Sequence, residues 1–171
     1  MYTSRFRLDK QISIEKALAY ATQTVNELSL RDVFMIGLAI YIGEGSKVPG
    51  IIRVSNSDPR IIKFSIIWFK KCFGLSNENF HVRIHAYPDT DQILSLNFWQ
   101  TELGLTESSF LAFSIDKRMG KNTAKAGSLP HGTAHLTVVS NGQKEFGILL
   151  HRKILATMDR ILNSGISLMV E

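Results

Sequence analysis

The segment Gly37-Leu-Ala-Ile-Tyr-Ile-Gly-Glu-Gly-Ser46 combines an apolar helical run with a charged end flanked by glycines. Glu44 is a lone carboxylate at the C-terminal end of this run, where the helix dipole disfavours negative charge, so we expect a bound cation to offset it. Ala39 and Gly43 are four residues apart and share one face of the helix. Because small residues let a second backbone approach closely, the segment predicts a packed helix that ends in a candidate metal carboxylate.

The composition is that of one soluble globular domain. The chain has 171 residues, of which 44% are hydrophobic and 20% charged, and this argues against a mostly disordered protein. The single cysteine, Cys72, excludes an intrachain disulfide and favours a reducing compartment. The longest apolar run, residues 33–43, has 11 residues, whereas a membrane span requires about 20. We therefore expect a cytoplasmic protein with no membrane segment.

Helix and strand patterns follow one another along most of the chain. A helix is expected over 13–27, and a second begins at Ser29, which forms a capping-box pattern with Asp32. Asp58-Pro59 and Gly74 mark the start and the end of a third helix. The remaining predicted elements are strands over 51–55, 80–86, 109–115 and 133–140, a helix over 89–103, and a final helix capped by Ser140 or Asn141 that runs to about Asn163, with Gly165 beyond it.

The order α-α-β-α-β-α-β-β-α, with short strands that have one polar face, predicts an α+β fold. Its sheet is expected to be antiparallel or mixed, with helices on one face only. No Pro/Gly-rich linker separates two cores. We therefore expect one main domain over residues 29–165, preceded by an N-terminal helical extension over residues 1–28.

Polar side chains alternate with apolar ones on the predicted strands. In 80–86 the even-numbered positions from Val82 to Ala86 are apolar, and the odd-numbered positions from His81 to His85 are polar. Polar groups on a sheet can hydrogen-bond base edges and phosphates, although an ordinary exposed sheet face is the alternative. The candidate DNA-binding residues on and beside the strands are Lys47, Arg53, Ser55, Asn56, His81, Arg83, His85, His135 and Thr137.

Positive charge is concentrated in one glycine-containing loop between Ser114 and His135. This loop supplies +3 of the net charge of +5. Each Lys or Arg that contacted a phosphate would add a salt-dependent contribution to nucleic-acid affinity, although a solvated surface loop is the alternative. The basic residues of the loop are Lys117, Arg118, Lys121 and Lys125.

Several other kinds of site do not fit the sequence. One Cys and five scattered His, with no CxxC or HxxxH spacing, argue against structural zinc. The string Gly43-Glu-Gly-Ser-Lys47 has neither the residue order nor the preceding strand of a phosphate-binding loop. The Gly-x-Ser-x-Gly nucleophile elbow of esterases is also missing.

Residues 37–45 resemble the nine-residue motif of the LAGLIDADG homing endonucleases and their relatives. Ala39 and Gly43 match the small residues at positions three and seven, and Glu44-Gly45 match the acidic residue and the glycine that end the motif. Gly37 stands at position one, where the motif has Leu, and Ile42 stands at position six, where it usually has Asp.

Two further stretches resemble a bacterial branch of the same family. They are Val54-Ser-Asn-Ser-Asp-Pro59, which enters a predicted helix, and Gly132-Thr-Ala-His-Leu-Thr-Val138, a predicted strand before the terminal helix. The resemblance therefore covers about residues 30–160. It implies a LAGLIDADG-like fold, in which a saddle-shaped sheet lies over DNA.

The family resemblance also implies an assembly and a metal site. In the family, the motif helices of two domains pack at a two-fold axis, and the acidic residue that ends each helix binds a divalent metal, usually Mg²⁺. Because this chain has one motif, the resemblance implies a homodimer with Ala39 and Gly43 at the interface. It implies metal ligation by Glu44 and the Gly43 carbonyl. The candidates for the basic catalytic residue are Lys117 and Lys121, with Lys47 as a third.

The function implied by the resemblance is a homodimeric, Mg²⁺-dependent endonuclease that hydrolyses phosphodiester bonds at a specific site in double-stranded DNA. Two alternatives stay open. The first is a catalytically inactive DNA-binding or regulatory protein that keeps the scaffold. The second is a structural dimer whose basic loop has no nucleic-acid role.

Overall fold

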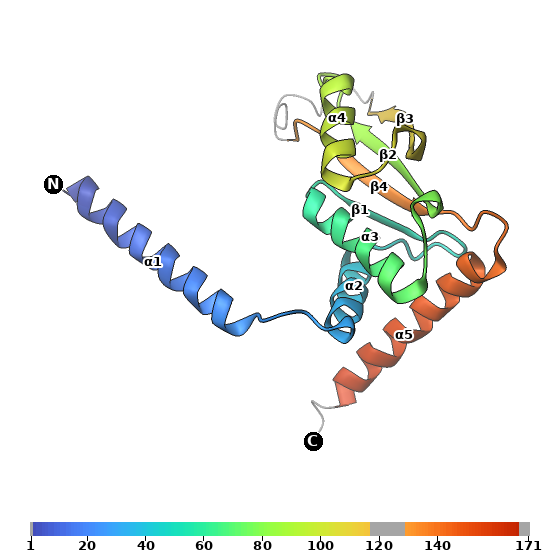
Figure 1. Ribbon diagram of the computed structural model, residues 1–171, viewed down its shortest axis with the longest axis horizontal. Helices are drawn as coiled ribbons and strands as arrows, with labels where there is room; N and C mark the ends of the chain where they lie inside the picture. The colour runs from blue at the N-terminus through green and yellow to red at the C-terminus, as the bar shows by residue number, and fades with distance from the viewer. Residues whose placement is uncertain (1, 117–128, 168–171) are drawn as a thin grey trace.

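The computed structural model describes residues 2–116 and 129–167. Within these residues, five α-helices and four strands follow one another in the predicted order, so the α+β class is confirmed (Figure 1). The four basic residues of the predicted loop lie outside the described residues: Lys117, Arg118, Lys121 and Lys125.

The described strands form one mixed sheet in the order β1-β4-β2-β3. The strands are β1 (Arg53–Asn56), β2 (Phe80–Ala86), β3 (Phe110–Ile115) and β4 (Thr133–Val138). β4 runs antiparallel to both β1 and β2, whereas β2 and β3 are parallel. The last strand along the chain therefore lies inside the sheet, which places side chains from four separate segments on one surface.

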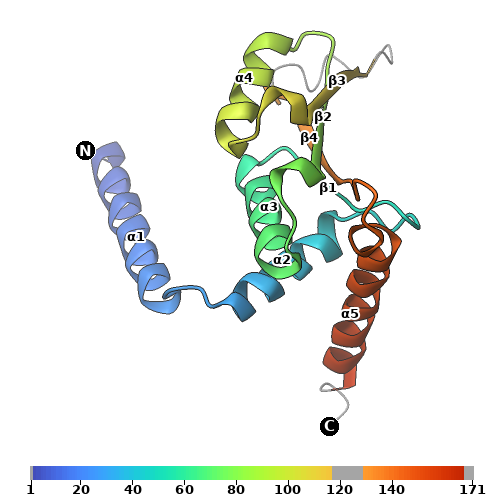
Figure 2. The same ribbon diagram turned by 45° about the vertical axis from the view of Figure 1, so that its right-hand side comes forward.

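Helices cover one face of this sheet. The helices are α1 (Tyr2–Thr24), α2 (Leu30–Glu44), α3 (Pro59–Phe73), α4 (Gln92–Leu103) and α5 (Ile148–Ser167). α3 and α4 lie against the sheet, and α2 packs against α3 and α5 (Figure 2). The opposite face of the sheet is left uncovered by the described helices (Figure 2).

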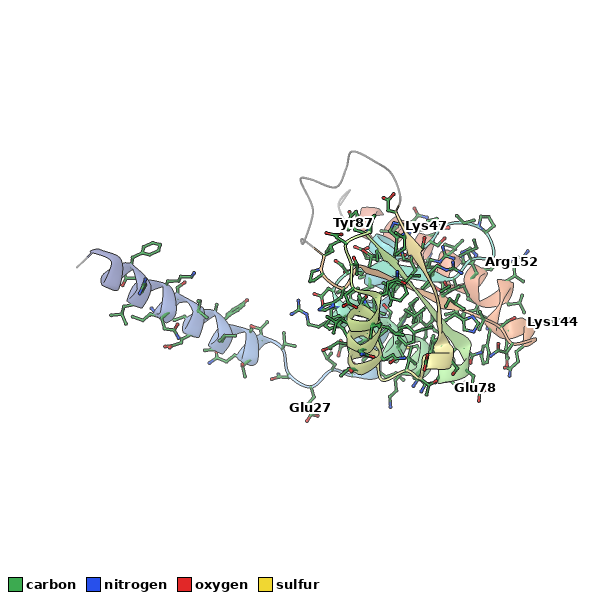
Figure 3. All side chains as sticks on the ribbon, turned by 90° about the horizontal axis from the view of Figure 1, so that it is seen from above. Glu27, Lys47, Glu78, Tyr87, Lys144 and Arg152 are labelled. Carbon is green, nitrogen blue, oxygen red and sulfur yellow. The ribbon has the colours of Figure 1, made fainter. Side chains whose placement is uncertain are left out.

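α1 stands apart from the other helices in both ribbon views (Figures 1 and 2). Residues 25–29 connect it to α2, and Glu27 in this connection is labelled in Figure 3. The predicted helix over 13–27 is wrong at both ends, since the helix begins at Tyr2 and ends at Thr24. Among the described helices, none is both long enough and apolar enough to cross a membrane.

The local start and stop patterns of α2 and α3 are confirmed. The Ser29 side chain accepts the Asp32 N–H at 3.2 Å, and the Asp32 carboxylate accepts the Ser29 N–H at 2.9 Å, so both halves of the capping box are present. Asp58 accepts the N–H of the second helical residue of α3, and Pro59 is the first. Gly74 ends α3 with a φ of 74°, a left-handed conformation that favours glycine.

The core lies between the helices and the apolar face of the sheet. On β2, the even-numbered residues from Phe80 to Ala86 are buried and the odd-numbered residues face the other way, as the alternation predicts. On the helix side, Trp68 is fully buried next to Tyr41, with 6.0 Å between the ring centroids. Gly37 is also buried, and its backbone lies directly against the Trp68 ring.

The prediction for the final helix is wrong at both ends. Ser140 and Asn141 do not cap it, because Asn141 and Gly142 form a turn with φ values of 47° and 83°. A short 3₁₀ segment, Lys144–Phe146, follows before α5 begins at Ile148. α5 then continues through Gly165, which is predicted to lie beyond the helix, and ends at Ser167.

Candidate nucleic-acid interface

The uncovered face of the sheet is a concave polar surface, which we call the sheet face. Strand pairing builds it: Arg53 on β1 lies opposite Thr137 on β4, and Arg83 on β2 lies opposite His135 on β4. The resulting concavity has a volume of about 350 Å³. The residues that line it are Arg53, His81, Arg83, His85, Leu111, Ser114, His135 and Thr137. Six of these eight are candidate DNA-binding residues from the sequence.

Hydrogen bonds across the strands orient the polar side chains of the sheet face. Arg53 Nε donates to Thr137 Oγ1 at 3.0 Å. Ser55 Oγ and His135 Nδ1 share a hydrogen bond at 3.0 Å, which brings a seventh predicted residue into the cluster. These two bonds tie β1 to β4 and fix one atom of each of the four side chains.

The sheet face carries two guanidinium groups close to the His135 ring. Burial lowers the pKa of the His135 ring below its ordinary value, and Arg53 together with the other cations nearby lowers it further. Within the described part of the chain, no carboxylate lies at ion-pair distance from either Arg53 or Arg83. A bound anion would therefore meet two guanidinium groups that are not paired with any acid of residues 2–116 and 129–167.

β3 contributes two residues to the sheet face that are not among the predicted site residues, Leu111 and Ser114. Arg83 pairs with Leu111, but His85 pairs with Ser114, so the register shifts between these two pairs. His85 Nδ1 and Ser114 Oγ share a hydrogen bond at 3.2 Å. Because the irregularity breaks simple alternation on β3, the alternating pattern could not place Leu111 and Ser114 on the same surface.

Asn56, another predicted DNA contact, is not brought to the sheet face. It pairs with Ala134, which is buried on the helix side of the sheet. Its side-chain oxygen accepts the backbone N–H of Asp58 at 2.8 Å, so it shapes the turn that leads into α3. Asn56 thus acts at the junction between β1 and α3.

The predicted metal site at the end of α2 contains a lysine ammonium. Glu44 and Gly43 are exposed there. Lys47 Nζ donates to the main-chain oxygens of Tyr41, Ile42 and Gly45 at 2.8, 2.8 and 2.7 Å. The cation that this helix end requires is therefore supplied by the chain itself.

A divalent ion does not fit at this position in one chain while the Lys47 ammonium occupies it. Glu44 is the one acidic side chain of the segment, and nowhere among residues 2–116 and 129–167 do three His, Cys, Asp or Glu side chains converge to hold a metal. Three nearby carbonyl oxygens already accept hydrogen bonds from Lys47, and an ammonium repels a second cation.

The two small residues of α2 that were predicted to face a partner are exposed. Ala39 and Gly43 lie on the surface, and a side chain at Gly43 would meet nothing within 4 Å. Ile36, one turn before Ala39, is an exposed large apolar residue. Gly37, in contrast, faces the core. α2 thus has one buried face and one exposed face composed of small and apolar residues.

Comparison with protein-family models, with curated proteins and with solved structures finds no match to this chain. The resemblance to the LAGLIDADG group therefore stays a prediction that rests on the residues quoted for it.

Proposed function

We propose that this protein binds double-stranded DNA through the sheet face, as a homodimer. The observation that supports this most is the position of Arg53 and Arg83 on one concave surface, with no acidic partner in the described chain. A guanidinium group forms paired hydrogen bonds with phosphate oxygens and with the guanine edge in the major groove. The neighbouring histidine, serine and threonine side chains add groups that contact phosphates and bases in DNA complexes.

A polyanionic partner explains the sheet face better than an ordinary solvated surface does. None of the eight residues that line the concavity is acidic, although acidic residues number 15 in the chain. Solvated surfaces usually mix both charge signs. A purely structural dimer gives no reason for acidic residues to be excluded from this surface. Binding to a phosphate backbone does, because an acidic side chain there would repel the phosphates.

The exposed face of α2 supports the homodimer. Ala39 and Gly43 would let the α2 helices of two chains approach closely, and Ile36 would be covered by the partner. Two copies would then present two sheet faces to one duplex. A symmetric pair of this kind binds two half-sites, which raises both the affinity and the length of sequence that is read.

Replacing Gly43 with leucine is expected to convert the dimer to monomers. A side chain at this position meets no atom within 4 Å in one chain, so the monomer should fold normally, while the partner helix would be pushed away. Sedimentation velocity over a range of protein concentrations measures the change. Leucine in place of Gly165, which is also open in the monomer but lies on α5, serves as the control. A Gly43→Leu protein that remains dimeric would show that the interface lies elsewhere.

Binding without metal-dependent cleavage is the form of the function that we favour. The family resemblance implies an Mg²⁺ endonuclease, but the Lys47 ammonium lies at the helix end where that metal would be held. The alternative of a non-cleaving DNA-binding protein needs no ion at this position. The lysine contacts therefore favour the second reading over the first.

The test of the proposed function is a titration of a fluorescein-labelled DNA duplex, followed by anisotropy, first in EDTA and then in Mg²⁺. The proposal expects binding in EDTA that does not require Mg²⁺, a decrease in affinity when either Mg²⁺ or monovalent salt is added, and an intact duplex on a gel. Cleavage that requires Mg²⁺ and is lost in Glu44→Gln would restore the endonuclease reading. Failure to bind any duplex from a random-sequence library would overturn DNA binding itself.

A further inference from the structure

Lys47 is held over the C-terminal end of α2 by a compact turn. Gly45 caps the helix with extended backbone angles, φ −82° and ψ 146°, and its N–H donates to the Tyr41 carbonyl. Ser46 N–H then donates to the Arg53 carbonyl at 2.8 Å, and Tyr41 Oη donates to the Ser46 carbonyl at 2.9 Å. The turn is therefore fixed from both sides, and it directs the Lys47 side chain back toward the helix end.

The surroundings of the Lys47 ammonium resemble the shell of a hard metal ion. Three carbonyl oxygens surround Nζ within 2.8 Å, matching the three N–H donors of an ammonium group. The Tyr41 ring lies on another side, with its centroid 5.5 Å from Nζ. Glu44 adds a negative charge nearby, which counteracts the lowering of the Lys47 pKa by burial. Main-chain carbonyls and a carboxylate are the ligands that Ca²⁺, Mg²⁺ and lanthanide ions prefer.

We propose that the Lys47 ammonium is a resident cation that occupies the position of a divalent ion at the end of α2. The wild-type chain therefore does not bind a metal at Glu44. Removing the ammonium, while keeping an unbranched side chain one atom shorter, exposes an oxygen-lined site that accepts a hard metal ion through Glu44 and the main chain. This inference concerns one chain and holds whether or not the sheet face binds DNA.

Terbium(III) luminescence tests the inference, because Tb³⁺ binds oxygen ligands and emits when a nearby tyrosine is excited. Tyr41 is within range of any ion that replaces Nζ. Wild type is expected to give no sensitised emission that depends on Glu44. Lys47→Met is expected to bind Tb³⁺ at least about tenfold more tightly than wild type, and the double variant Lys47→Met/Glu44→Gln should lose this gain. Lys63→Met, which removes an exposed lysine from α3, should behave as wild type.

Two results would overturn the inference. One is wild-type Tb³⁺ emission that disappears in Glu44→Gln, because a metal would then share the site with the lysine. The other is a folded Lys47→Met protein that gains no Tb³⁺ affinity, because the ammonium would then be only a helix cap. If Lys47→Met fails to fold, NMR of the ¹⁵N-labelled lysine side chains in wild type provides the test. The inference predicts that the ammonium signal of Lys47 does not change in excess Mg²⁺. A shift of this signal would contradict the inference.

Discussion

Gly37→Ala is expected to destabilise the fold strongly, although it adds only one methyl group to α2. The added methyl group would overlap the Cγ, Cδ1 and Cδ2 atoms of the Trp68 ring. Trp68 cannot move aside easily, because it is fully buried and packs against Phe69 and Phe73, with ring centroids 4.7 and 5.2 Å away. The overlap must therefore separate α2 from α3.

The expected cost is about 3 kcal/mol, at the upper end for an overpacked core. For a chain of this length, that lowers the melting temperature by roughly 6–12 °C. Thermal unfolding followed by circular dichroism, at one fixed protein concentration, measures the effect.

Gly165→Ala is the matched control for this substitution. The new methyl group meets nothing within 4 Å on α5, so the intrinsic helix preference of alanine should leave stability unchanged or raise it by up to about 1 kcal/mol. If Gly37→Ala were as stable as this control, the close contact between α2 and the Trp68 ring would be wrong. Gly37 also departs from the motif that the sequence resembles, and the Trp68 contact gives a physical reason for glycine at that position.

The Arg53→Ala/Arg83→Ala double variant is expected to show the largest loss of DNA affinity. Each guanidinium that contacts a phosphate adds on the order of 1 kcal/mol, so the pair should lower affinity by about 30-fold or more. The slope of log affinity against log salt should fall in magnitude by about two for each chain, because fewer counterions are released. Fold stability should change little, since both side chains lie on the polar side of the sheet.

The control for this variant is Arg152→Ala/Lys153→Ala, which removes the same charge from exposed positions on α5. Arg152 projects from this helix in Figure 3. A general effect of net charge would weaken DNA binding equally in both double variants, whereas a specific role of the sheet face predicts a small effect for the α5 pair. Equal losses in the two variants would contradict the proposed binding surface.

Local sequence patterns predicted most of the fold because they reflect local physics. The alternation on 80–86 identified both faces of β2, and the Ser29–Asp32 and Asp58-Pro59 patterns located the starts of α2 and α3. These features depend on neighbours a few residues away. The start of α5 was missed because the Asn141-Gly142 turn, with both residues in the left-handed region, delays the helix to Ile148.

The composition of the site was predicted only where alternation holds. Arg53, His135 and their neighbours on regular strands were found, whereas Ser114 joined the sheet face through a register shift that is not visible in the sequence. The contacts of Lys47 with the end of α2 arise from a tight turn and likewise could not be derived from spacing. In both cases the deciding factor is backbone geometry between elements.

The pKa of His135, measured by NMR with and without a saturating DNA duplex, tests the central claim most directly. In the free protein, burial and the adjacent cations hold this pKa below the ordinary value of about 6.5. A phosphate backbone on the sheet face favours the protonated ring and should raise the pKa, so the complex takes up a proton and DNA affinity should increase as pH falls toward the free-state pKa. A raised His135 pKa in the complex is the predicted result, and a His135 pKa that is the same with and without bound DNA would contradict binding at the sheet face.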